Sequence, residues 1–216
     1  MTGTIGLIGG TGPEGKGLAS RFVAAGLEVV IGSRSAERGE EAAREIAAIA
    51  GRGLRGATNS DAAKAADVVV ITLPYAGQAE TLPALAGDIG SRIVVSTVVP
   101  LQFSRRRVSM LEIPAGSAAE EAQSLLPEAR VASAFHNLAA AQLLDVNHEI
   151  EGDVIVCADD ADALAAVMEL AGAIKSVRGV NGGPLANSRY VEGMTALIVN
   201  INRIYKAEAH VRIVGI

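Results

Sequence analysis

The chain has 216 residues, of which 50% are hydrophobic, so it can bury a core of ordinary size. Aromatic residues make up 3% and the net charge is -5, which argues against a nucleic-acid partner. A single cysteine, Cys157, excludes an internal disulfide framework, and no apolar run approaches the length of a membrane span; we therefore expect a cytoplasmic protein without a membrane partner.

Short β-branched segments alternate with alanine-rich stretches along most of the chain. The apolar segments predict strands at Thr4–Ile8, Val29–Ile31, Val68–Thr72, Ile93–Ser96, Val131–Ala134 and Val154–Cys157. The stretches between them predict helices at Gly15–Ala25, Ala36–Ile49, Asp61–Ala66, Ser117–Leu125 and Ala161–Ala171. Segments that are apolar throughout are typical of strands covered on both faces by helices. The pattern therefore predicts an α/β fold of the Rossmann type, with a doubly wound parallel sheet.

The pattern changes after Asn181, where Gly182, Gly183 and Pro184 interrupt the chain and a last helix is expected from about Asn187. Apolar residues recur on one face of this helix at Met194, Leu197, Ile198, Ile201, Ile204 and Tyr205. We expect a dinucleotide-binding domain over 1–180 and a small helical cap over 181–216. The apolar face would help to close a crevice or form a subunit interface, and it favours a homodimer.

The first strand runs into a glycine-rich turn with the pattern G-x-G-x-x-G, formed by Gly10, Gly12 and Gly15. In a strand-turn-helix setting, the first glycine makes the turn and the second lets a pyrophosphate touch the backbone. The third lets the helix pack on the strand, and the helix N-terminus offers N–H groups to the phosphates. A purely structural turn is the alternative, but the context favours a dinucleotide.

The second strand ends in Ser33 and Arg34, with Arg38 four residues further on, where NAD-binding folds carry an acidic residue for the ribose. If Ser35 caps the next helix, Arg38 falls in its first turn, where a cation opposes the helix dipole. Two guanidinium groups and a hydroxyl suit a 2′-phosphate. The residues therefore predict NADP(H) rather than NAD(H), with solvated surface charges as the alternative.

Four later motifs carry a resemblance that covers essentially the whole chain: VVSTVVP (Val94–Pro100), SAFHNLAA (Ser133–Ala140), VCADD (Val156–Asp160) and GGPLANSRYVE (Gly182–Glu192). With GGTG and VVIGSR, they resemble the F420-dependent NADP oxidoreductases, also called 8-hydroxy-5-deazaflavin:NADPH oxidoreductases. The resemblance implies an oxidoreductase that transfers a hydride, reversibly, between NADP(H) and the deazaflavin coenzyme F420. One departure is Pro13-Glu14, because family members usually carry Asn or a similar residue followed by an apolar one.

The resemblance also implies positions for two coenzymes. Residues expected along NADP(H) are Gly10, Thr11, Gly12, Pro13, Glu14, Ser33, Arg34, Arg38, Leu73, Pro74, Val98 and Ala140. Residues expected to face the deazaflavin are His136, Asn137, Leu138, Gly183, Pro184 and Leu185. His136 contacts the ring or serves only as a structural histidine. The run Arg105-Arg106-Arg107 is a solvated loop or attracts the anionic tail of the deazaflavin.

Hydride transfer joins two rings that already carry the chemistry, so neither a nucleophile nor a metal is expected, and the sequence offers no metal-spaced cluster. Two other functions stay open at this point. The protein could be an NADP-dependent reductase of an imine, a quinone or a metal ion, since related folds share the glycine turn. It could also be a non-catalytic NADP(H) sensor that signals to a partner protein.

Overall fold

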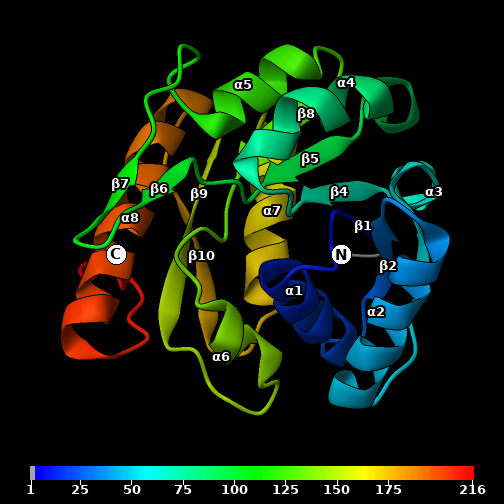
Figure 1. Cartoon of the computed structure of the whole chain (residues 1–216), viewed down its shortest axis with the longest axis horizontal. Coiled ribbons are helices and arrows are strands. Elements are labelled where there is room, and N and C mark those ends of the chain that lie inside the picture. The colour runs from blue at the N-terminus through cyan, green and yellow to red at the C-terminus, as the bar shows by residue number, and fades with distance from the viewer. Residues whose placement is uncertain (1–2) are drawn as a thin grey trace.

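The computed structural model describes residues 3–216, and in this range an eight-stranded sheet lies between two layers of helices (Figure 1). The strands of the sheet are β1 (Thr4–Ile8), β2 (Glu28–Ser33), β3 (Arg55–Thr58), β4 (Val68–Ile71), β5 (Ile93–Ser96), β8 (Arg130–Ser133), β9 (Gly152–Ala158) and β10 (Val177–Asn181). The longer helices are α1 (Pro13–Ala24), α2 (Ala36–Ala50), α4 (Gln78–Ile89), α7 (Ala161–Gly172) and α8 (Ser188–Tyr205). Shorter helices are α3 (Asn59–Ala65), α5 (Ala118–Leu125), α6 (Ala140–Leu144), η1 (Tyr75–Gly77) and η2 (Leu185–Asn187).

The strands follow the order β10-β9-β8-β5-β4-β1-β2-β3. The pairs from β8 to β3 are parallel, and the order reverses between β4 and β1. Strand β9 pairs with β8 in the antiparallel direction and with β10 in the parallel direction. The predicted doubly wound Rossmann-type sheet is therefore confirmed, but its last two strands run against the others.

The core consists of one apolar cluster on each face of the sheet, as alternation along β4 shows. Val68 and Val70 pack with α1, α2 and α7 on one face, while Val69 and Ile71 pack with α3, α4 and α5 on the other. Because both faces of β4 are buried, the run of four β-branched residues needs no polar alternation. The two clusters hold the strands in place, so the loops at the carboxyl ends of the strands can form a site.

The structure adds elements that the sequence analysis does not include. These are β3, β10, α4, α6 and an antiparallel hairpin of β6 (Leu101–Phe103) and β7 (Val108–Met110). The predicted strands and helices are all present, with bounds that differ by a few residues. The expected domain division at 180/181 falls at the end of β10. Residues 1 and 2 of the expected dinucleotide-binding domain lie outside the described range.

The last helix, α8, lies beside the β6–β7 hairpin at the left of Figure 1, away from the strands β1 to β3. Its buried face is formed by small and polar residues as well as apolar ones: Ser188, Val191, Glu192, Thr195, Ala196 and Ile198. In the predicted apolar face, only Ile198 is buried, whereas Leu197, Ile204 and Tyr205 are exposed. The apolar face is thus directed mainly away from the fold that supports the helix.

Candidate functional site

A cleft of about 710 Å³ opens at the carboxyl ends of the strands where the strand order reverses. Open α/β sheets bind ligands at this point because the loops of neighbouring strands diverge there. The cleft is lined by Gly9, Thr11, Gly12, Pro13, Glu14, Ser33, Arg34, Arg38, Asn59, Thr72, Leu73, Pro74, Gly77, Glu80 and Thr81. Nine residues that the sequence analysis places along NADP(H) therefore lie around one cavity.

The three glycines of the turn have two different roles. A Cβ on Gly10 would lie 2.6 Å from Cγ1 of Ile31, and a Cβ on Gly15 would lie 2.6 Å from Cα of Gly10. These two glycines let the strand, the turn and α1 pack closely. A Cβ on Gly12 would have no atom within 4 Å, and the backbone there is extended, with φ -77°. Since the protein itself does not need a glycine at this position, the open space in front of it fits a ligand that touches the backbone.

The turn ends in a helix whose N-terminus has no side-chain cap. Gly12 is the N-cap residue of α1 and Pro13 follows at the first helical position. The N–H of Lys16 donates to the carbonyl of Gly12 over 2.9 Å, which closes the first turn of the helix. N–H groups before that point have no partner in the helical ladder and suit an anion such as pyrophosphate.

Asn59 is a cleft residue that the sequence analysis missed. Its Oδ1 accepts a hydrogen bond from the N–H of Gly9 over 3.0 Å, and Gly9 has a left-handed φ of +71°. Asn59 is buried at the start of α3, directly after the short strand β3. Because Arg55–Thr58 has no apolar pattern, no local signal indicates that a strand end brings this amide to the glycine turn.

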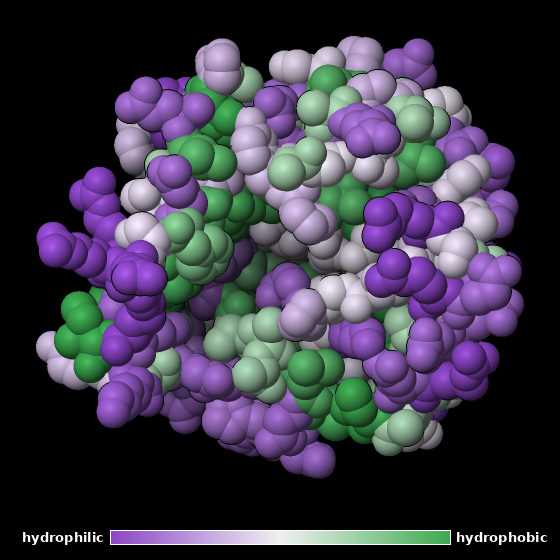
Figure 2. Space-filling view, in the orientation of Figure 1, coloured by the Kyte–Doolittle hydropathy of each residue, from purple (hydrophilic) through white to green (hydrophobic). Residues whose placement is uncertain are grey.

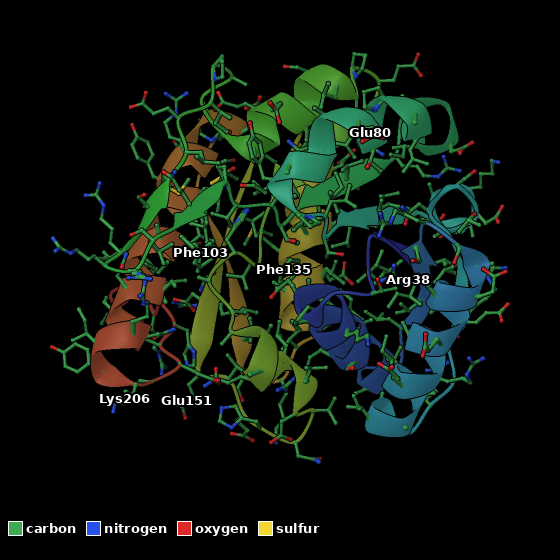
Figure 3. All side chains as sticks on the ribbon, in the orientation of Figure 1. Arg38, Glu80, Phe103, Phe135, Glu151 and Lys206 are labelled. Atoms are coloured by element: carbon green, nitrogen blue, oxygen red, sulfur yellow. The ribbon has the colours of Figure 1, made fainter. Side chains whose placement is uncertain are left out.

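Two arginines of the cleft lining are exposed at or just before the start of α2. Arg34 follows β2, and Arg38 lies in the first turn of α2, as predicted; Figure 3 labels Arg38. Neither forms an ion pair with any residue in 3–216. Ser33 beside them is buried, whereas Ser35 makes no side-chain cap hydrogen bond to α2. Two unpaired guanidinium groups at a helix N-terminus fit a phosphate.

Glu14 has an unusual environment for a carboxyl group in an anion-binding cleft. Its Oε1 is buried and has no hydrogen-bond partner within the described chain. Burial raises the pKa of this carboxyl to about 8, so the group is mainly neutral at pH 7. The repulsion expected between a Glu14 carboxylate and a pyrophosphate is therefore absent in the neutral form.

The remaining residues predicted for NADP(H) lie around this cleft or further along the sheet edge. Leu73 and Pro74 follow β4 and line the cleft, and a Cβ on Gly9 would lie 2.5 Å from Cδ2 of Leu73. Val98 follows β5 and is buried in the core cluster with α4 and α5. Ala140 begins α6, which packs against α1. The contact of Val98 and Ala140 with a nicotinamide stays a prediction.

The segment predicted to face the deazaflavin follows β8. His136, Asn137 and Leu138 are all buried, and the preceding Phe135 has a left-handed φ of 69° that turns the chain sharply. The Asn137 amide donates to the carbonyl of Asp153 over 2.8 Å. In His136, both ring nitrogens are buried without a partner in residues 3–216, and burial lowers its pKa to about 4. The imidazole is therefore neutral, with one donor and one acceptor available to a ligand.

The GGPL turn lies against the ends of β8 and β9. The N–H of Ala158 donates to the carbonyl of Gly183 over 3.1 Å, and the Ser188 hydroxyl bonds that of Ser133 over 2.7 Å. Thr195 of α8 donates to the carbonyl of His136 over 3.1 Å, so the last helix packs against the segment that follows β8. Leu185 is buried in the core cluster, so a substitution there would disturb packing before it tested ring binding.

The run Arg105-Arg106-Arg107 forms the exposed turn of the β6–β7 hairpin, and Arg203 of α8 donates to the carbonyl of Arg105 over 3.0 Å. Figure 2 shows the face of the molecule that is also seen in Figure 1. This face is hollowed near its centre and has hydrophilic residues on its left and right rims.

Among the described residues, no group of His, Cys, Asp and Glu side chains could hold a metal ion. None of the helices in this range has the length and apolar character that a membrane span requires.

Comparison with known proteins decides the family. Residues 4–100 match the family described as NADP oxidoreductase, coenzyme F420-dependent. The chain is 42% identical over 209 residues to the F420-dependent NADP reductase of Methanothermobacter thermautotrophicus, covering 94% of this chain and 90% of that protein. It is 39% identical over 211 residues to the F420-dependent NADP reductase of Methanocaldococcus jannaschii, covering 94% of both. The chain belongs to the F420-dependent NADP reductase family.

Solved structures agree with this family at the level of the fold. The crystal structure of an Arthrobacter sp. FB24 protein assigned to F420-dependent NADP reductases has a TM-score of 0.83 at 23% identity and covers 98% of this chain and 99% of that chain. An imine reductase from Bacillus cereus has a TM-score of 0.64 at 16% identity and covers 94% of this chain and 62% of that chain. The fold is thus shared by reductases of different acceptors.

Proposed function

We propose that this protein transfers a hydride between NADP(H) and coenzyme F420, the activity named for the Methanothermobacter and Methanocaldococcus relatives. The observation that carries the proposal is the cleft itself. Its lining includes Gly12, where the protein leaves open space, and two arginines that form no ion pair within residues 3–216. A dinucleotide with a 2′-phosphate matches both features at once.

The residues present fit NADP(H) from one end of the cleft to the other. Arg34 and Arg38 would hold the 2′-phosphate, and the N-terminus of α1 would hold the pyrophosphate. Leu73 and Pro74 would flank the adenosine side. Charge-assisted hydrogen bonds from the arginines favour NADP(H) over NAD(H) by about 2 kcal/mol or more, which is at least about 30-fold in affinity.

For the deazaflavin, the orphaned nitrogens of His136 are the observation that supports a polar ligand beside the strand end. A buried imidazole without partners costs free energy, and a bound ring that supplies a donor or an acceptor removes that cost. The nicotinamide and deazaflavin rings supply the hydride chemistry themselves. The protein holds both rings in one geometry and excludes water, while the neutral His136 orients the ring without donating a proton as an imidazolium.

A second copy of the chain is the partner that we propose for α8. Tyr190, Leu197 and Ile204 are exposed, and with the partly buried Met194 and Ile201 they recur every three or four residues along the helix. Such a stripe of large apolar side chains suits a self-complementary helix contact across a two-fold axis. The homodimer is tested by light scattering of the wild type and of Leu197→Glu, which should be monomeric.

Activity tests the proposed function against its rivals. Purified protein, NADPH and oxidised F420 are mixed, and the visible absorbance of the deazaflavin is followed. Loss of that absorbance, with weak or no reaction of imines and quinones, is the expected result. Tight NADPH binding without reduction of F420 would favour a sensor, and faster reduction of another acceptor would favour a different reductase.

A further inference from the structure

Glu14 is a partly exposed residue of the cleft whose Oε1 is buried, and the proposed hydride transfer does not use its carboxyl. It is the second residue of α1, directly after Pro13, and it lines the cleft together with Gly12 and Thr11. Acidic side chains are common in the first turn of a helix because the helix dipole stabilises their negative charge. In this turn, however, the phosphates of the dinucleotide are expected to bind at the positive N-terminal end of α1.

One carboxyl oxygen of Glu14 is buried and lacks, within the described range, the hydrogen-bond partner that a buried charged oxygen requires. This atom, Oε1, is an exception, because most buried polar atoms in native proteins are satisfied. An ionised carboxylate in this position would be costly, because charge burial without pairing is unfavourable by several kcal/mol. A neutral carboxyl, by contrast, carries an O–H that can donate to a ligand.

Charged groups around the cleft do not compensate Glu14. Lys16, on the same helix, forms an ion pair with Glu45 of α2, the helix that packs beside α1. Arg34 and Arg38 are exposed at the start of α2, and Glu80 on α4 adds a second acidic group to the lining (Figure 3). Helix α6, which also packs on α1, has no charged residue, and the buried His136 is neutral. Desolvation by burial is the cause that raises the pKa of Glu14 to about 8.

We propose that Glu14 binds NADP(H) as a neutral carboxylic acid that donates a hydrogen bond to an oxygen of the dinucleotide, so that binding requires its proton. The inference rests on the proposed NADP(H) site and specifies how that site is regulated. Binding of an anion next to Glu14 further disfavours its ionised form. Above the titration of free Glu14, the Kd for NADPH therefore rises about tenfold per pH unit, and each dinucleotide takes up a proton as it binds.

The test measures the Kd for NADPH by calorimetry between about pH 7 and pH 9.5, where the 2′-phosphate is already mostly ionised. Wild type is compared with Glu14→Gln, which stays neutral and keeps an N–H donor, and with Glu14→Leu, which is neutral and has no donor. We expect a Kd that rises with pH in the wild type only, and a weaker Kd at pH 7 for Glu14→Leu than for Glu14→Gln. Calorimetry in two buffers of different ionisation enthalpy should show proton uptake in the wild type and none in Glu14→Gln.

Parallel pH profiles of the wild type and Glu14→Gln, with tight NADPH binding in both, would overturn the role of Glu14 and leave the proposed function intact. Equal affinities of Glu14→Leu and Glu14→Gln would overturn the hydrogen bond. If neither the wild type nor Glu14→Gln binds NADPH at any pH, the proposed function falls together with this inference. Thermal unfolding of each variant at pH 7 checks that the fold is kept.

Discussion

Asn59 holds Gly9 through a hydrogen bond of 3.0 Å from the Gly9 N–H to the side-chain Oδ1, across fifty positions of sequence. The residue thereby connects the end of β3 to the turn after β1. The amide also lies close to β2, because a Cβ on Gly32 would be 2.9 Å from the same Oδ1. Asn59 acts as a positioning residue for the glycine turn, and through the turn it acts on the dinucleotide.

Replacing Asn59 with Ala should weaken NADPH binding about fivefold to tenfold, because the lost hydrogen bond is worth about 1 kcal/mol and holds the pyrophosphate-binding turn in place. Fluorescence titration with NADPH measures the change. Asn202→Ala is the matched control, since Asn202 accepts from the N–H of Ala209 near the C-terminus, far from the cleft. An equal loss of affinity in both variants would show that Asn59 has no particular connection to the site.

Gly12→Val and Gly10→Ala should separate ligand binding from folding. Valine at position 12 has an allowed backbone and open space, so the protein should fold normally and lose NADPH binding, because the methyl groups occupy the dinucleotide's place. Alanine at position 10 would clash with Ile31 and Leu7, and should cost about 1–3 kcal/mol of folding free energy. Thermal unfolding measures the stability of both variants, and titration with NADPH measures their affinity for the dinucleotide. Normal NADPH affinity in Gly12→Val would contradict the ligand role of this glycine.

Arg34→Ala should weaken NADPH binding by about 1.5–3 kcal/mol and leave NADH binding almost unchanged, because a charge-assisted bond to the 2′-phosphate exists only in the first complex. Arg44→Ala is the matched control: Arg44 is an exposed arginine of α2, the helix that follows Arg34, and it does not line the cleft. The two Kd values of each variant are measured at one salt concentration. Equal losses for NADPH and NADH would show that Arg34 does not recognise the phosphate.

Glu192 should make the stability of the fold depend on pH. Its carboxyl is fully buried on α8 and accepts the N–H groups of Ala118 (2.9 Å) and Ala119 (3.2 Å) at the start of α5. Burial, together with the nearby Glu120 and Glu121, raises its pKa to about 7. Because the folded-state pKa lies above the unfolded value, the stabilising contribution is complete below about pH 4.3 and is lost as the pH rises through about 7.

Urea unfolding of wild type and Glu192→Gln at about pH 5 and about pH 8 measures this effect. The wild type should lose up to about 3 kcal/mol relative to Glu192→Gln over this interval, since the glutamine cannot ionise. Contributions of other groups, including Glu14, cancel in the difference between the two proteins. Equal pH slopes would mean that Glu192 titrates normally.

The parts of the fold that follow local patterns could be predicted, and those that depend on tertiary context could not. Val68–Ile71 is apolar throughout because both its faces are covered, so its strand and its central place were readable. The run Val154–Cys157 is equally apolar, but its strand pairs antiparallel with β8. The composition of a strand does not indicate whether it runs parallel or antiparallel to its neighbour. Pro83 lies inside α4 and weakened the signal for that helix.

The parts of the candidate site that belong to a local sequence motif could be predicted from the sequence. Gly12, Arg34 and Arg38 come from a turn and a strand end whose neighbours are close in sequence, and all three line the cleft. Asn59 and Glu80 reach the same cleft from the first turns of α3 and α4, which are distant in sequence from the glycine turn, so no local pattern could predict them. The neutrality of Glu14 is likewise a property of burial, which only the assembled fold reveals.

The most direct test of hydride transfer uses NADPH that carries deuterium at the reactive carbon of the nicotinamide. The protein is mixed with this NADPH and oxidised F420, and the reduced deazaflavin is analysed by mass spectrometry. We predict that deuterium appears in the reduced F420 and that NADP⁺ forms in equal amount, because the rings are held together and the hydride passes directly between them. Unreduced F420, or reduced F420 whose new hydrogen comes from water, would contradict the account.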